Sequence, residues 1–167
     1  MRDFSKVSPS IWRSKKFRAT KDPMCKMVYL YLLTCPHGNS AGCFDIDPLY
    51  ASADLETTPE AFREAINRLC EVGLIEWDGD ENTVWIVQWE EFNKPTNPKH
   101  AAGLLSQLEQ ASSEKLKSKC FHAFMPIFKA SQFDRDAVLR KAIDSFLGLY
   151  PKPIITKTER RPDQIKT

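Results

Sequence analysis

The chain has 167 residues, of which 42% are hydrophobic, and this is enough for one core with an appendage rather than several independent domains. Its longest apolar run, 28–33, is far shorter than the roughly 20 residues of a membrane-spanning helix, so we expect neither export nor membrane insertion. The net charge of +2 says little about partners by itself. Five cysteines without CxxC spacing are typical of reduced thiols, and we expect a cytoplasmic location.

The charges are distributed unevenly along the chain. Residues 1–21 carry seven Lys or Arg and one Asp, for a net charge of +6. Residues 22–96 carry four basic and fourteen acidic side chains, for a net charge of −10, and residues 97–167 carry thirteen and seven, for +6. This asymmetry indicates an electrostatic function at the two ends. We interpret residues 1–21 as a basic N-terminal arm.

Three helices are predicted after the arm. Each begins with a capping side chain followed by proline, at Asp22-Pro23, Asp47-Pro48 and Thr58-Pro59. The first ends before Pro36 and is apolar almost all round, which is typical of a buried central helix. The second runs to Leu55, and the third ends at Gly73.

Three strands are predicted around these helices. Residues 41–46 indicate a short strand between the first two helices. After Gly73, residues 74–77 and 83–89 are rich in β-formers and flank a turn-forming stretch, which predicts a hairpin. The order helix, strand, helix, helix, hairpin is that of a winged helix, a helix-turn-helix variant. The predicted fold class is therefore α+β, mainly helical, with a winged-helix domain over residues 22–93.

Appended C-terminal helices are predicted over residues 97–150. One begins at Asn97-Pro98, a second follows Ser112-Ser113, and a third covers about 134–150. We expect Pro126 to stop or kink the second of these helices. The tail 151–167 has three prolines, mixed charge and no periodicity, so we expect it to be disordered.

Several segments resemble winged-helix replication initiators, or replisome organisers, of phages and prophages. The resemblance covers roughly residues 7–125 and is carried by short motifs. These are Trp12-Arg13 with Phe17, the stretch YLYLLTCPHGN from Tyr29 leading to Ala41-Gly42, LCEVGLIEW from Leu69, and NPKHAAGLL from Asn97. The resemblance implies sequence-dependent DNA binding in replication initiation or its regulation, and contact with replication proteins of the host or phage.

Two groups of residues are candidates for contact with duplex DNA. In winged helices the third helix usually enters the major groove, where Arg63 and Arg68 can pair with guanine and Asn67 with adenine. The second group surrounds Phe17 with four cations suited to phosphate, namely Arg13, Lys15, Lys16 and Arg18. A solvated basic linker is the alternative for this second group.

A rival function follows from the acids of the third helix. Three acids, Glu60, Glu64 and Glu71, share its solvent face with the arginines. In a DNA groove these carboxylates would be repelled by the phosphates. The rival is an acidic module of the same fold that binds a protein partner, or mimics DNA, instead of binding DNA. Homo-oligomerisation stays open, because it depends on whether residues 97–150 leave an apolar face uncovered.

Two further patterns favour structural roles. Trp77, Trp85 and Trp89 can in principle stack exposed bases, but hairpin tryptophans more often pack against helices. Lys115, Lys117 and Lys119 lie two residues apart, so we expect them to spread around their helix as solubilising charges.

No enzyme or cofactor is predicted, because glycine-rich phosphate loops, HExxH and other catalytic motifs are missing from the sequence. The one ligand-like cluster, Cys35, His37 and Cys43 with Cys70 as a fourth ligand, matches no standard zinc spacing.

We therefore predict no tightly bound metal in the purified protein. Elemental analysis should find zinc well below one equivalent. Stoichiometric zinc that is lost together with folding in Cys35→Ser would contradict this prediction.

Overall fold

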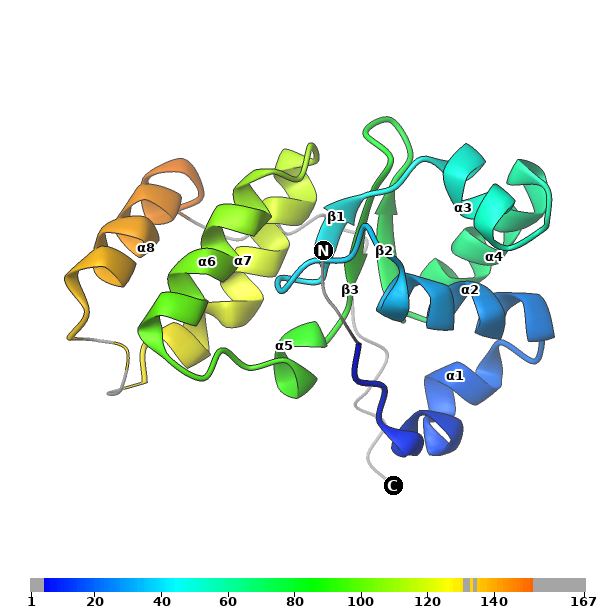
Figure 1. Cartoon of the computed structure of the whole chain (residues 1–167), viewed down its shortest axis with the longest axis horizontal. Helices are drawn as coiled ribbons and strands as arrows, with labels where there is room; N and C mark the ends of the chain where they lie inside the picture. The colour runs from blue at the N-terminus through cyan, green and yellow to red at the C-terminus, as the bar shows by residue number, and fades with distance from the viewer. Residues whose placement is uncertain (1–4, 131–132, 134, 152–167) are drawn as a thin grey trace, which may run out of the picture.

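A three-stranded antiparallel sheet separates two groups of helices (Figure 1). The computed structural model describes residues 5–130, 133 and 135–151, and in this part of the chain the fold is α+β and mainly helical. The strands are β1 (Cys43–Asp45), β2 (Ile75–Asp78) and β3 (Thr83–Ile86), in the spatial order β1-β3-β2. All four residues of the central strand β3 are buried. Side chains of alternate residues leave a strand on opposite faces, so both faces of the sheet must be covered.

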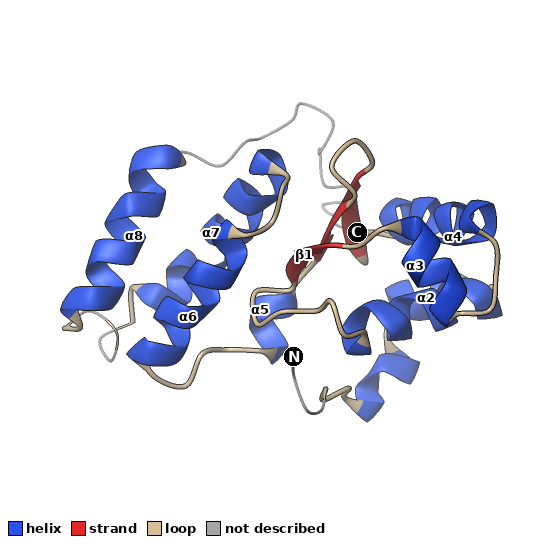
Figure 2. Ribbon diagram, turned by 45° about the horizontal axis from the view of Figure 1, so that its top comes forward, coloured by secondary structure: helices blue, strands red, loops and turns tan. Residues whose placement is uncertain are grey.

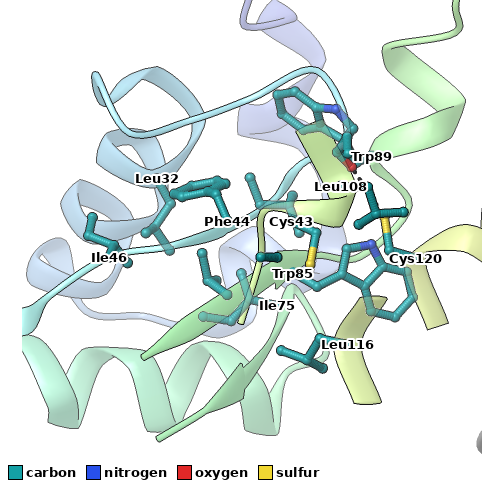
Figure 3. Packing of buried hydrophobic residues seen from close by; sticks show 14 of the residues in the cluster. Leu32, Cys43, Phe44, Ile46, Ile75, Trp85, Trp89, Leu108, Leu116 and Cys120 are labelled. Carbon is teal, nitrogen blue, oxygen red and sulfur yellow. Dashed lines mark hydrogen bonds between the residues drawn. The ribbon is translucent and has the colours of Figure 1, made fainter. Parts of the chain in front are cut away.

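One face of the sheet is covered by α2 (Pro23–Thr34), α3 (Pro48–Asp54) and α4 (Pro59–Glu71). Each helix begins at the predicted cap and proline. The caps are formed: Asp22 accepts from the N–H of Met24, Asp47 from Leu49 and Thr58 from Ala61. Phe44 of β1 lies beside Leu32 of α2 in this half of the core (Figure 3).

The opposite face is covered by α7 (Glu114–Phe128), with α6 (Pro98–Glu109) and α8 (Ala137–Leu149) further from the sheet (Figure 2). Cys43 and Trp85 are paired across β1 and β3, and both lie on the side of Leu116 and Cys120 (Figure 3). The residues 97–150 therefore share one continuous core with residues 22–93 rather than forming a separate domain.

The predicted order of elements is present between Asp22 and Trp89, as α2, β1, α3, α4, β2 and β3. Two boundaries differ from the prediction. The second hairpin strand ends at Ile86, because Gln88 has a left-handed φ of 64° and Trp89 begins a short helix, α5 (Trp89–Phe92). The helix α7 passes through Pro126 and ends at Phe128, so the proline does not stop it there.

Residues 9–19, which lie in the predicted basic arm, do not form a free arm. A 3-10 helix, η1 (Pro9–Arg13), is followed by α1 (Lys15–Ala19), neither of which was predicted. Phe17 is completely buried, and its ring packs against Tyr29 with centroids 5.8 Å apart. A large aromatic side chain removed from water stabilises the folded chain by about 1.5–3 kcal/mol, which ties this segment to the core. The predicted disordered tail lies outside the described residues, apart from Pro151.

Position 42 requires glycine, both for its backbone conformation and because a neighbouring side chain lies close to it. Its φ is +67°, and a Cβ atom at this position would overlap the indole of Trp89. That indole is held in place, because its Nε1 donates to the carbonyl oxygen of Ser40 at 2.8 Å.

We predict that Gly42→Ala lowers the free energy of unfolding by about 2–4 kcal/mol, from backbone strain and overpacking together. The matched control is Gly103→Ala in α6, where a Cβ meets nothing within 4 Å. The control should stabilise the protein by about 0.5–1 kcal/mol, because alanine is the better helix former. Urea unfolding followed by circular dichroism measures both, and equal stabilities of Gly42→Ala and the parent would contradict the prediction.

Candidate nucleic-acid interface

The helix α4 presents the solvent face that its sequence predicts. Its apolar side is buried through Phe62, Ala65, Ile66 and Leu69. Its exposed side chains are Glu60, Arg63, Glu64, Asn67, Arg68 and Glu71.

The charges on this face are ordered. Successive helical residues turn by about 100°, so Arg63 and Arg68 lie near opposite edges of the exposed face. Glu60, Glu64 and Glu71 lie between them, together with Asn67. The centre of the face is therefore acidic and its two edges are basic.

Arg68 is engaged within the fold. Its Nη1 lies 3.2 Å from Oδ2 of Asp22, the capping residue of α2. The pKa of Asp22 is lowered, chiefly by the hydrogen bond from the N–H of Met24 and also by Cys25 and by the positive charge of Arg68. Within the described part of the chain, Arg63 has no ion pair, so it is the more available of the two arginines.

The basic N-terminal segment contacts the turn at the end of α4. The Nζ of Lys16 donates to the carbonyl oxygen of Gly73, 3.0 Å away, in the turn that follows α4. Arg13, Lys15 and Arg18 are exposed and form no ion pair with a described acid. The structure thus places Lys16, from one predicted group of cations, beside the end of α4, which carries the other group, although sequence spacing alone did not connect them.

Several acidic side chains of residues 22–96 form hydrogen bonds inside the fold. On the α7 side of the sheet, Asp78 Oδ2 accepts from the hydroxyl of Ser113, and Asp45 accepts from both the N–H and the hydroxyl of Ser112. Thr83 links the two, because its hydroxyl donates to Asp45 and accepts from the N–H of Ser113. These contacts join the hairpin to the start of α7, and the sequence analysis did not identify them.

Two of the three lysines expected to be solubilising have partners instead. The Nζ of Lys119 lies 2.7 Å from Oε2 of Glu76 on β2, and both side chains are largely shielded from solvent. Lys117 is buried and pairs with Glu114 in the first turn of the same helix. The expectation is wrong for these two because α7 packs on the sheet, which brings Lys119 to Glu76 and buries Lys117 beside Glu114 of its own helix. Lys115 is exposed.

The aromatic and thiol groups of the hairpin region are mostly internal. Trp85 and Trp89 are buried, in accordance with the structural interpretation, and Trp77 is partly buried. Cys35 and Cys43 are buried as well. Among residues 5–130, 133 and 135–151, no three His, Cys, Asp or Glu side chains are grouped so as to hold a metal ion.

In comparisons with known proteins, no family model, curated protein or solved structure matches this chain. None of the helices in the described residues has the length and apolar character needed to cross a membrane.

The hydrogen bond from the N–H of Met24, together with the contact with Arg68, lowers the pKa of Asp22 and so makes stability depend on pH. A carboxyl group whose pKa is lower in the folded state stabilises the protein above the unfolded-state pKa, and this contribution is lost as pH falls through the folded-state pKa. Because both side chains are partly exposed, the ion pair contributes no more than about 1 kcal/mol.

We predict that Asp22→Asn is slightly less stable than the parent at pH 7 and equally stable well below pH of about 4. Asp47→Asn is the control, since Asp47 caps α3 in the same way but has no ion pair with a described residue. Urea unfolding at a series of pH values measures the difference. A stability gap for Asp22→Asn that persists unchanged at low pH would show that the carboxylate charge is not its cause.

Proposed function

We propose that this protein is a winged-helix DNA-binding protein in which α4 approaches the major groove of a duplex. The order of α2, β1, α3, α4, β2 and β3 supports this, as does the β1-β3-β2 order of the sheet, in which β2 and β3 form the hairpin. A helix whose polar face is fully exposed and whose apolar face is buried can enter a groove without loss of core packing.

The observation that carries the proposal is the position of the basic segment against α4. Lys16 holds α1 to the turn after α4, and we infer that the exposed Arg13, Lys15 and Arg18 of the same segment reach the duplex beside the end of that helix. Cations at the flank of a groove-reading helix contact the phosphates on either side of the groove and supply most of the affinity. In this arrangement the basic segment holds the duplex, and Arg63 with Asn67 selects bases.

The described part of the second basic region, residues 97–167, lies on the other side of the sheet. The helices α6 and α8 lie across the sheet from α1 and α4, toward the other end of the longest axis (Figure 1). Exposed cations on this side, such as Lys99 and Lys141, do not belong to the same surface as the α1 cations. They fit a contact with replication proteins rather than with the same stretch of duplex. The proposed role in phage or prophage replication rests on the sequence resemblance, and the proposed cytoplasmic location rests on the cysteine pattern.

A second candidate function is supported by the acidic centre of α4. Glu60, Glu64 and Glu71 are exposed and have no ion pair with a described cation. Three like charges on one helix face repel phosphate and attract a basic protein surface. In this alternative α4 docks onto a basic partner, and the cations of α1 are solvated.

Replacing Arg13, Lys15 and Arg18 by alanine, with Lys16 retained, should weaken binding to all duplex sequences alike and flatten the salt dependence by about one unit of slope per lost phosphate contact. The control replaces Lys99, Lys129 and Lys141, which removes the same charge from the other side of the sheet and should change affinity little. Arg63→Ala should instead relax preference at particular bases, at a cost of roughly 1–3 kcal/mol. Fluorescence anisotropy with several duplexes across a salt series measures all three.

Charge reversal of α4 separates the two candidates. Glu60→Lys, Glu64→Lys and Glu71→Lys together should strengthen duplex binding if α4 faces phosphate, because three repulsions become attractions. The protein-binding alternative predicts negligible duplex affinity in the parent at low salt. Equal duplex affinity of the parent and the α1 variant at low and moderate salt would overturn the assignment of α1.

A further inference from the structure

A cavity of about 180 Å³ lies between the N-terminal segment, α2, the end of β3 and α5. Its walls are largely apolar and include four aromatic residues, Phe17, Tyr29, Trp89 and Phe92. Ile11 and Leu33 add aliphatic surface. This volume is slightly larger than a cavity that accommodates benzene, so it suits one ring or a branched aliphatic group.

The charged side chains around this cavity are all basic. Lys6 and Lys16 line it, and no aspartate or glutamate does. An adjoining hollow of about 270 Å³ shares Lys6 and Trp89 with it and adds Lys94 and His100, again without an acid. The surroundings therefore favour an anion over a neutral or cationic molecule.

Tyr29 supplies a polar group that the fold leaves unused. The residue is 8% exposed, and burial raises the pKa of its hydroxyl to about 12, so the hydroxyl stays protonated at neutral pH. No described residue forms a hydrogen bond with this hydroxyl, whereas the hydroxyl of Tyr31 two residues later bonds to Asp54. Unlike Trp85 Nε1 and Ser118 Oγ, which are buried without a partner among the described residues, the hydroxyl oxygen of Tyr29 reaches solvent, so a ligand can accept a hydrogen bond from it.

The mouth of the cavity carries an exposed apolar side chain. Phe92 of α5 is 72% exposed and lines both hollows. The helix α5 is set against the cavity by Gln88, whose left-handed backbone begins the helix without a side-chain cap. A bound molecule that covered Phe92 would remove apolar surface from water and so gain affinity.

We propose that this cavity binds a small organic carboxylate with an aromatic or branched aliphatic body. The body lies against Tyr29, Trp89 and Leu33, and the carboxylate accepts hydrogen bonds from the Tyr29 hydroxyl and from a lysine at the rim. Lys16 can take part while it holds Gly73, because an ammonium group has three N–H donors. This site is separate from the duplex-binding function proposed above.

The test titrates the full-length protein with benzoate, phenylacetate and 3-methylbutanoate by calorimetry, and with phenylacetamide as the neutral counterpart. We expect saturable one-site binding of at least one carboxylate and binding of the amide that is several-fold weaker. Tyr29→Phe should weaken carboxylate binding about tenfold, the effect of losing one hydrogen bond to a charged group. Lys6→Gln should weaken it several-fold, because it removes a rim cation.

Two matched variants serve as controls. Tyr50→Phe removes the hydroxyl of an exposed tyrosine outside the cavity, and Lys99→Gln removes an exposed lysine outside both hollows. Both should bind like the parent, and thermal unfolding checks that every variant is folded.

Three outcomes would overturn the proposal: no saturable binding of any carboxylate, equal binding of phenylacetamide and phenylacetate, or unchanged carboxylate binding by folded Tyr29→Phe. Duplex affinity is measured on the same samples. A protein that binds DNA but no carboxylate overturns the cavity alone, and one that binds carboxylate but no DNA overturns the duplex-binding function alone.

Discussion

The burial of β3 on both faces is the constraint on which the rest of the structure depends. Four residues from Thr83 to Ile86 are the central strand of a small sheet, and none of them is exposed. A three-stranded sheet cannot shield its middle strand on two sides by itself, so helices from both halves of the chain must pack on it. This is why residues 97–150 belong to the same core as the helix and hairpin elements that precede them, and why Trp85 lies beside Leu116 and Cys120.

The same constraint decides which charges remain at the surface. Where α7 meets the sheet, Asp45, Asp78 and Glu76 are turned toward serines and a lysine and are satisfied there. The net charge of the middle segment therefore overstates the acidity that a partner meets. Among the described residues, three exposed acids without an ion pair share one face of α4, and Lys16 holds the basic segment of α1 beside the end of that helix. Both proposed functions depend on this remaining distribution, and it follows from packing rather than from composition.

Much of the architecture was predictable from local signals. Capping residues followed by proline placed the starts of α2, α3, α4 and α6, because a side-chain acceptor and a fixed φ favour the first turn wherever the helix packs. The periodicity of Phe62, Ile66 and Leu69 identified the buried side of α4, and hence its exposed side, before any tertiary contact was known. The segment from Pro9 to Ala19 was missed, since its helices are short and are stabilised by long-range contacts such as the burial of Phe17 and the bond from Lys16 to Gly73.

The sequence by itself determined the local conformations and the side of each helix that faces the core, because these depend on neighbours within one or two turns. Tertiary structure alone decided the long-range partners: Lys16 with Gly73, Arg68 with Asp22, and Lys119 with Glu76. Each of these contacts joins residues more than forty positions apart, and no periodicity records such a pairing. The cavity beside Tyr29 is of the same kind, since its walls come from four separate segments that meet only when the N-terminal segment and α2 pack against the end of the hairpin and α5.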